Sequence, residues 1–288
     1  MSITVDIAIA KGFIQDTDTQ MVVYKNGIDA LNAFLDGTVD IGTTSPNTII
    51  FSDQFDPKKH AIVGTISYTD NQLKLLTRNA SGITQFSDIK GKKVAVIGAF
   101  DHFALYKQLS FNGIPQDAVT VVTMSKKQMP IAIAAGQVDA VFQHGKPIES
   151  SKKALGKGKW KVFQSQNMAR KLLVLMMNRK MIKQHPNMVN KVFKGILKAQ
   201  EFLKTHPEEC IEIVSKSKNY PLPKAQEAIE EITYDLKLRQ SLLLAMETME
   251  TWAIDKHFVE RETSRNYFDY VDPKPLKKAA PDAVTFIH

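Results

Sequence analysis

The stretch FLDGTVDIGTTSPNT, residues 34–48, sets out a motif that the chain uses again as AIAAGQVDAVFQHGKP, residues 132–147. In both copies an apolar run with helical spacing ends at a glycine, Gly37 or Gly136, where a helix C-terminus favours a left-handed residue. A short run with strand character follows, and then a loop rich in polar residues. The motif therefore predicts helix, strand and loop in the same order twice, once in each of two lobes.

Alternating strands and helices continue between the two copies. The runs at residues 60–67, 73–78, 92–98 and 118–124 have the apolar, β-branched character of strands, and residues 102–115 have the pattern of a helix. This alternation predicts an α/β fold with mostly parallel sheets. After residue 186 the pattern changes to four helices, including one over residues 223–237, which predicts a helical C-terminal region.

The length of 288 residues favours two lobes over one core. We place the crossings between them at the apolar strands 73–78 and 171–179. Residues 1–77 and 172–288 then form a discontinuous first lobe, and residues 78–171 form an inserted second lobe.

Composition excludes several classes of protein. Apolar residues make up 43% and charged residues 24%, which is typical of a soluble globular chain, and no apolar run reaches the roughly 20 residues that span a bilayer. The first residues lack the pattern of a signal peptide, so we expect either a cytoplasmic chain or an exported one whose signal has been removed. The net charge of +8 comes mainly from Lys in scattered short runs, which indicates a solvated surface and no nucleic-acid partner.

No catalytic, metal or cofactor motif is present. Cys210 is the single cysteine, which excludes an internal disulfide and a CxxC metal site and indicates a buried apolar residue. The seven histidines lack metal-ligand spacing. The junction VAVIGAFDHFAL, residues 94–105, lacks the glycines of a dinucleotide site, and no GxSxG elbow occurs. We therefore predict a protein without cofactor or metal that is not an enzyme.

Three aspartates have alternative interpretations. Asp40 and Asp139 occupy matching places in the repeat, and we interpret them as strand-end residues that bond nearby backbone groups rather than as an acid/base pair. Asp101 begins a helix, where we favour a role as N-cap. If it points into a cleft instead, it selects a cation or a hydrogen-bond donor on the ligand.

Several stretches together resemble one family. IAIAKGF (7–13), YKNGIDALNAFLDGTVDIGTTS (24–45), FSDIKGKKVAVIGAFDHFALYKQLSFNGI (86–114) and the second repeat copy look like the sulfonate, taurine and nitrate substrate-binding proteins of ABC importers, a family that also includes binders of thiamine-pyrimidine precursors. The closing YFDYVDPKPLKKAAPDAV is similar to the tail of that family. The resemblance implies a type II periplasmic-binding-protein fold, with two lobes that close on a small ligand in a cleft between them.

The resemblance also implies where the ligand binds, namely on loops that follow strands. In the first lobe these positions are Asn26, Thr44, Ser45 and Asn47, with Ser67, Tyr68 and Asp70 at the crossing. In the inserted lobe they are Phe100, Asp101, His102, Gln143 and His144. The implied partners are a small-molecule ligand and a membrane permease, the implied location is periplasmic or extracytoplasmic, and we expect a monomer.

Two departures from the family affect the ligand. Family members have a first strand ahead of the stretch at residues 7–13, so we expect a loop that lines the cleft to be either missing here or rebuilt from residues 2–6. The Gly-Ser or Gly-Thr before the anion-binding helix is Gly98-Ala99, followed by Asp101, which leaves an amine or amide ligand open. Two other functions also stay open: an extracytoplasmic sensing domain of a signalling receptor, and an enzyme like the thiamine-pyrimidine synthases, against which the single cysteine argues.

Overall fold

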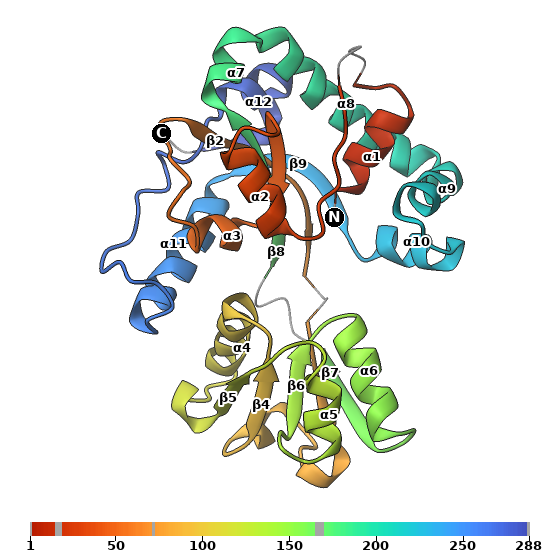
Figure 1. The fold of residues 1–288 in the computed structure, drawn as a ribbon, viewed down its shortest axis with the longest axis vertical. Helices are drawn as coiled ribbons and strands as arrows, with labels where there is room; N and C mark the ends of the chain where they lie inside the picture. Colours follow the sequence, from red (N-terminus) through yellow and green to blue (C-terminus); the bar gives the residue numbers. More distant parts are fainter. Residues whose placement is uncertain (1, 15–18, 71–72, 165–169, 287–288) are drawn as a thin grey trace. The chain divides into compact units, whose positions relative to one another are not determined.

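The computed structural model describes residues 2–14, 19–70, 73–164 and 170–286 (Figure 1). These residues form two compact units. Unit 1 contains Met1–Thr69 and Lys171–His288, and unit 2 contains Asp70–Arg170. Sequence analysis placed the first boundary after residue 77. It lies earlier because β3 (Lys74–Arg78) pairs along its length with strands of unit 2.

Unit 1 has a sheet in the order β1-β8-β2-β9-β10. Its strands are β1 (Ile41–Thr44), β2 (His60–Thr69), β8 (Lys171–Asn178), β9 (Thr233–Arg239) and β10 (Val284–Thr285). Its helices are α1 (Ile3–Ala10), α2 (Gly27–Leu35), α3 (Pro46–Ile50), α7 (Arg179–Gln184), α8 (Pro186–Thr205), α9 (Pro207–Lys218), α10 (Leu222–Glu230), α11 (Gln240–Asp255) and α12 (Lys274–Ala279), with a 3-10 turn at Pro281–Ala283. Strand β8 lies between β1 and β2 and bonds to both.

Unit 2 has a sheet in the order β5-β4-β6-β3-β7. Its strands are β3, β4 (Lys93–Val96), β5 (Thr120–Thr123), β6 (Ala140–Gln143) and β7 (Trp160–Gln164). Its helices are α4 (Ala99–Phe111), α5 (Met129–Ala134) and α6 (Lys146–Leu155), with 3-10 turns at Asn79–Ser81, Phe86–Ile89 and Gln116–Ala118.

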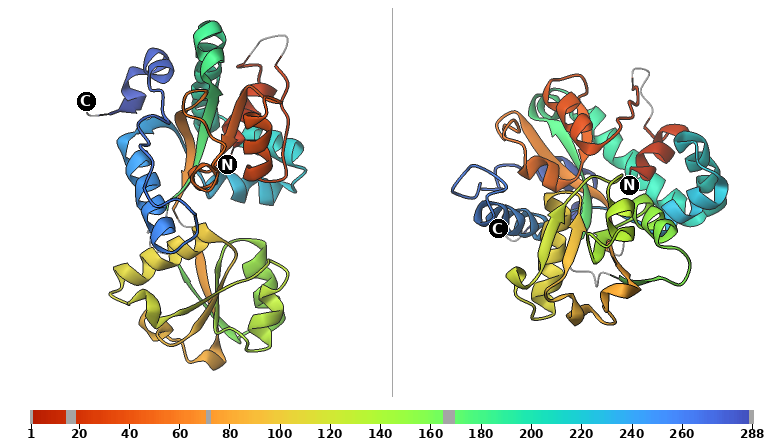
Figure 2. Two further views of the ribbon diagram at one scale, coloured as in Figure 1. Left: turned by 60° about the vertical axis from the view of Figure 1, so that its left-hand side comes forward. Right: turned by 60° about the horizontal axis from the view of Figure 1, so that its bottom comes forward.

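Alternation along the strands builds two cores in unit 2. On β3, Leu75 packs into a cluster with Leu105 and Leu109 of α4, while the next residue, Leu76, packs into a second cluster with Ile133 of α5. Successive side chains of a strand point to opposite faces, so a continuous apolar run serves both layers. Figure 2 shows the result, with α4 on one face of this sheet and α5 and α6 on the other.

The expectation of mostly parallel sheets is wrong. In unit 1 the pairs β1–β8, β8–β2 and β2–β9 are antiparallel, and only the short β9–β10 pair is parallel. In unit 2, β4 runs parallel to β5 and β6, but β3 runs antiparallel to β6 and β7. The long strands β2 and β8 account for most of the antiparallel pairing in unit 1. The chain leaves unit 1 along β2 and returns along β8, so the two strands run in opposite directions.

A second correction concerns residues 233–237, which sequence analysis gave to a helix. They belong to β9, in which Leu236 and Leu238 are buried and their neighbours are partly exposed. This alternation has the period of a strand, and Thr233 and Tyr234 favour a strand as well. The helical pattern ends with α10 at Glu230.

The repeated motif has the predicted helix, glycine stop and strand in both units. Gly37 has φ +83° and Gly136 has φ +72°, values that only glycine adopts without strain. Each strand begins directly after the aspartate of the motif, Asp40 or Asp139, rather than before it. Strand β1 ends at Thr44, and β6 ends at Gln143. The following residues, expected as loops, enter short helices, α3 and α6, which both carry Pro in the first turn.

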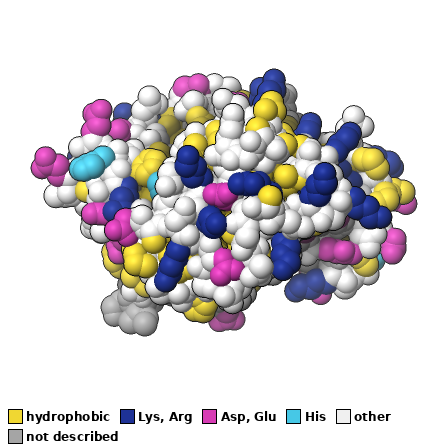
Figure 3. All heavy atoms as spheres, turned by 90° about the horizontal axis from the view of Figure 1, so that it is seen from below, with side chains coloured by type: hydrophobic (Ala, Val, Ile, Leu, Met, Phe, Trp, Pro, Cys, Tyr) yellow, Lys and Arg dark blue, Asp and Glu magenta, His cyan; other side chains and the backbone are white. Residues whose placement is uncertain are grey.

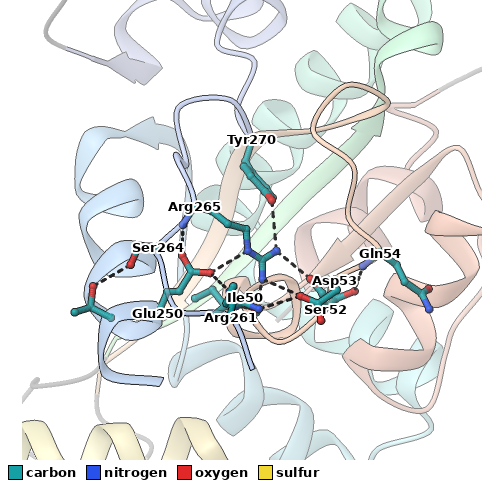
Figure 4. A network of polar contacts seen from close by, with 10 residues as sticks. Ile50, Ser52, Asp53, Gln54, Glu250, Arg261, Ser264, Arg265 and Tyr270 are labelled. Atoms are coloured by element: carbon teal, nitrogen blue, oxygen red, sulfur yellow. Dashed lines mark hydrogen bonds and ion pairs between the residues drawn. The ribbon is translucent and has the colours of Figure 1, made fainter. Parts of the chain in front are cut away.

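A buried carboxylate joins the C-terminal segment to the body of unit 1 (Figure 4). Glu250 on α11 is fully buried, and it accepts hydrogen bonds from Arg261 Nε at 2.6 Å and Arg265 Nε at 2.9 Å. Both guanidinium groups also donate to the carbonyl oxygen of Ile50 at the end of α3, and Arg265 donates to the carbonyl oxygen of Ser52 at 3.0 Å. The network therefore holds α3, α11 and the segment before Tyr270 together.

Replacing Glu250 by Gln is expected to lower the free energy of unfolding by about 3 kcal/mol, because two partly buried guanidinium groups lose their counter-charge. Urea unfolding followed by circular dichroism measures the loss. The matched control is Asp53→Asn, which removes a carboxylate that pairs with the same two arginines but is 87% exposed. Equal losses for the two variants would contradict the role assigned to burial.

Candidate functional site

Three of the positions predicted in the first lobe lie together in unit 1. Asn26 is the N-cap of α2, and its Oδ1 accepts from the backbone N–H groups of Ile28 and Asp29, both at 2.9 Å. Thr44, at the end of β1, donates from Oγ1 to the carbonyl oxygen of Gly27 at 2.8 Å. A Cβ on Gly27 would lie 2.8 Å from the same Oγ1, so this close approach requires glycine.

Asn26, Thr44 and Ser45 line a cavity of about 640 Å³, whose described lining residues all belong to unit 1. Its walls come from α1, α8, β1, β8 and residues 19–24, and side chains such as Ile9, Leu173 and Val192 make them largely apolar. This volume lies in the range of small-molecule sites. Asn47, Ser67 and Tyr68 are not among its described lining residues. Asn47 accepts a hydrogen bond from Ser45 Oγ, and Ser67 is fully buried in β2.

A buried ion pair lines the same cavity, and sequence analysis missed it. Asp6 of α1 is 3% exposed, and Lys218 Nζ, at the end of α9, lies 3.0 Å from its Oδ1 and 2.7 Å from its Oδ2. Burial raises the pKa of Asp6 above its ordinary value, although the hydrogen bond and the charge of Lys218 act in the opposite direction. The sequence held one signal for this pair, because Asp6 is the single charged residue of a helix whose other residues, apart from Thr4, are apolar.

In unit 2 the structure brings Asp101, Gln143 and His144 together. Gln143 ends β6 and is 2% exposed, and its Nε2 donates to Asp101 Oδ2 at 2.7 Å. Its Oε1 accepts from the backbone N–H of His144 at 3.0 Å and lies 2.5 Å from His144 Nδ1. Gln143 therefore connects the start of α4 to the loop after β6, at the carboxyl ends of parallel strands, where α/β sheets bind ligands.

Asp101 is not the N-cap that sequence analysis favoured. Gly98 holds that position, and Asp101 lies in the first turn of α4, with its carboxylate bonded to Gln143. The neighbouring predicted residues differ in environment. Phe100 packs partly buried against the core cluster that contains Leu105, and His102 is half-buried in the same turn.

Asp70 forms an ion pair with Arg170, where the chain enters and leaves unit 2. Arg170 donates to it from Nε at 2.7 Å and from Nη2 at 3.2 Å, a bidentate ion pair. These two residues are the first and last of unit 2, so the pair joins the two chain segments that enter it. Tyr68, two residues earlier on β2, is half-buried.

The aspartates of the repeat have different surroundings. Asp139 is part of the scaffold, as predicted, because its Oδ2 accepts from the backbone N–H of Lys93 at 3.0 Å and its Oδ1 from Arg78 at 2.8 Å. Asp40 is exposed and lines the unit 1 cavity. Cys210 is buried, as predicted. Among the described residues, no group of three or more His, Cys, Asp or Glu side chains is arranged to hold a metal ion.

The chain, with its two α/β units, has the fold of the periplasmic binding proteins. The NMT1/THI5-like family model matches residues 3–210, and the chain belongs to that family. No curated protein matches the chain in sequence. No helix in the described part of the chain has the length and apolar character needed to cross a membrane.

Solved structures with this fold include proteins of different function. The periplasmic aliphatic sulphonate binding protein SsuA from Escherichia coli has a TM-score of 0.76 at 17% identity, over 94% of this chain and 89% of its own. A ligand-binding component of an ABC-type import system from Staphylococcus aureus has a TM-score of 0.68 at 15% identity, over 97% and 95%. The desulfurization enzyme DSZB has a TM-score of 0.59 at 11% identity, over 97% and 96%. These likenesses show the fold.

Replacing Lys218 by Met is expected to lower the free energy of unfolding by about 3 kcal/mol at pH 7, because Asp6 is left charged and buried without its partner. The loss should shrink as the pH falls. Burial raises the pKa of Asp6 in the folded state, and removal of Lys218, which acts in the opposite direction, raises it further, so the variant takes up this proton at higher pH than the unmodified chain and gains more stability on acidification.

Urea unfolding at pH 7 and pH 5 measures this pH dependence. The control is Lys216→Met, an exposed residue in the same last turn of α9. A loss that is the same at both pH values would contradict the assignment to Asp6.

Proposed function

We propose that this protein is the substrate-binding component of an ABC importer, which captures a small polar molecule and delivers it to a membrane permease. One observation carries the proposal: each unit has a polar cluster at the end of the strand in the repeated motif. Thr44 and Ser45 line the cavity of unit 1, and Gln143 and His144 follow the same pattern in unit 2. Membership of the NMT1/THI5-like family and the fold shared with SsuA support it.

The mechanism proposed is hinge closure. A ligand that contacts both clusters favours the state in which the units are closed on it. The free energy of these contacts determines how far the equilibrium between the open and closed states moves toward the closed state. Ser67, Tyr68 and Asp70 belong to or adjoin β2, which leads from unit 1 into unit 2. We assign them to the hinge region of this movement. The location proposed is extracytoplasmic, and the form proposed is a monomer.

The clusters favour a ligand with two kinds of polar group. Lys218 lines the cavity of unit 1 within its ion pair with Asp6, and an ammonium N–H beyond that pair can donate to an oxygen of an anionic group such as a sulfonate. Asp101 in unit 2 is an acceptor and suits an amine or amide. An aminosulfonate such as taurine, or an aminopyrimidine with an acidic substituent, would satisfy both, whereas nitrate satisfies only the first.

We further propose that the protein is not an enzyme, although the fold is shared with DSZB. Burial raises the pKa of the Cys210 thiol to about 11, so the single cysteine is protonated at neutral pH and is a poor nucleophile. A sensing domain of a signalling receptor would use the same ligand site. The sequence downstream of the gene, or coupling of the ligand to transport in membrane vesicles, separates the two functions.

Saturation with a cognate ligand is expected to raise the midpoint of thermal unfolding by about 5 to 10 °C at a concentration 100-fold above Kd. Scanning fluorimetry over a panel of sulfonates, aminosulfonates, nitrate, pyrimidines and amines identifies it. Small-angle X-ray scattering with that ligand should show a smaller radius of gyration. If no compound stabilises the chain, the proposed function fails, and if stabilisation occurs without compaction, hinge closure fails.

Replacing Gln143 by Met, which keeps the side-chain volume, is expected to weaken binding of that ligand by roughly 10- to 100-fold. The change removes the group that fixes Asp101 and His144. Titration calorimetry measures the affinity, with Gln137→Met as the control on an exposed turn of unit 2. Unchanged affinity in a folded Gln143→Met protein would exclude this cluster from the site.

A further inference from the structure

The charge of the chain is distributed very unequally between the two units. Unit 2 contains 15 Lys and Arg and 6 Asp and Glu, a net charge of +9, whereas the whole chain carries +8. The residues of unit 1 therefore carry a net charge of −1. Unit 2 holds 15 of the 38 Lys and Arg but only 6 of the 30 Asp and Glu, so its positive charge comes mainly from a scarcity of acidic residues, and this imbalance calls for an explanation beyond solubility.

The topology of the sheet brings many of these lysines to one edge. Strands β4, β6 and β7 run in the same direction, because β4 is parallel to β6 and both β6 and β7 are antiparallel to β3. Their amino ends therefore lie on the edge opposite to Gln143. Exposed lysines lie at or just before these ends and in the last turn of α6, and we call them the basic edge: Lys90, Lys93, Lys153, Lys157, Lys159 and Lys161.

The basic edge is extended in one direction. Lys93 on β4 and Lys161 on β7 are separated by three strand spacings, because β6 and β3 lie between these strands. At about 4.8 Å per spacing this distance is roughly 14 Å. Figure 3, which views the molecule from below, shows Lys and Arg side chains distributed over that face with acidic side chains among them. A row of this length suits a planar anionic partner better than a single bound ion.

The acidic residues near the edge do not neutralise it. Asp139 is bound to Arg78, and Glu149 is bound to Lys152, a lysine outside the set defined above. Asp88 accepts hydrogen bonds from Thr84 and Gln85, which lower its pKa to about 2, so it stays charged, and Asp117 is exposed. Asp88 and Asp117 are therefore the two carboxylates left to offset the charge of the six exposed lysines of the basic edge.

The residue types distinguish between possible anionic partners. Recognition of nucleic acid relies on the planar guanidinium group of Arg, and both arginines of unit 2, Arg78 and Arg170, are paired with aspartates. The exposed cations are Lys, which act as point charges. Trp160, between Lys159 and Lys161, is partly buried against the core cluster that contains Leu76, and Lys152 Nζ lies 4.9 Å from its ring centroid, so packing within unit 2 accounts for this side chain. A group of several exposed lysines that act as point charges is typical of surfaces attracted to anionic lipid headgroups.

We propose that the basic edge of unit 2 is a docking surface for a membrane face rich in anionic phospholipid. The attraction is electrostatic and comes from several lysines together, each contributing about a fivefold gain in affinity. It acts over a Debye length of about 8 Å at physiological salt and weakens as salt rises. The proposal does not depend on the identity of the transported ligand.

The test is co-sedimentation of the full chain with vesicles of phosphatidylcholine alone or with one quarter phosphatidylglycerol, at several NaCl concentrations. We expect binding only to the anionic vesicles, with loss of binding at high salt. The variant with Lys90, Lys157, Lys159 and Lys161 all changed to Gln should lose more than 100-fold in affinity. The control changes Lys58, Lys183, Lys194 and Lys277, four exposed lysines of unit 1, to Gln, and it has the same net charge.

The control should keep most of the binding, and thermal unfolding of both variants verifies that they fold. Three results would overturn the proposal: no binding to anionic vesicles at low salt, equal losses in the two variants, or binding of the unmodified chain to duplex DNA or an acidic protein but not to vesicles. The first leaves the edge without an anionic membrane partner. The second shows that binding depends on the net charge of the chain and not on the position of the lysines. The third assigns the basic edge to a different macromolecule.

Discussion

The left-handed turn that ends α2 and α5 determines where the polar residues of both units lie. At Gly37 and Gly136 the chain adopts a positive φ that a side chain would strain, so the helix stops there and the strand starts a few residues later. Thr44 and Gln143 occupy the same place after these glycines, as the last residues of β1 and β6. One backbone constraint, used twice, therefore places two polar side chains at corresponding strand ends in two separate sheets.

Features that depend on neighbouring residues could be predicted from the sequence, and features that depend on distant ones could not. The glycine stops, the helices that begin after His185 and His206, and the apolar strands of unit 2 all follow from local pattern and capping. Strand direction does not, because β8 inserts between β1 and β2 from more than 100 positions away. Residues 233–237 were assigned to a helix although their alternation and the residues Thr233 and Tyr234 favour a strand, and the structure pairs this segment with β2.

The candidate site divides in the same way. Gln143, His144 and Thr44 were predicted from the family resemblance, at loops that follow the repeat, whereas the partner of Asp6 lies at position 218, near the end of α9. A single acid in an apolar helix signals that a partner exists, but a sequence without its fold gives no means to choose among many lysines. Two predicted residues have structural partners that account for their polarity: Asn26 caps α2, and Asp70 pairs with Arg170.

The direction of the strands in unit 2 separates two surfaces of different chemistry. Asp101, Gln143 and His144 lie at the carboxyl ends of β4 and β6, and the basic edge lies at their amino ends. Strand β4 has four residues, which span about 13 Å, and this exceeds the Debye length of about 8 Å at physiological salt. The lysines of the basic edge therefore have little effect on which ligand charge the polar cluster of Asp101, Gln143 and His144 prefers. A sheet of this kind can vary its surface charge at one end and keep its ligand preference at the other, because exposed charges at one end are separated from the other by more than a Debye length of the surrounding solvent.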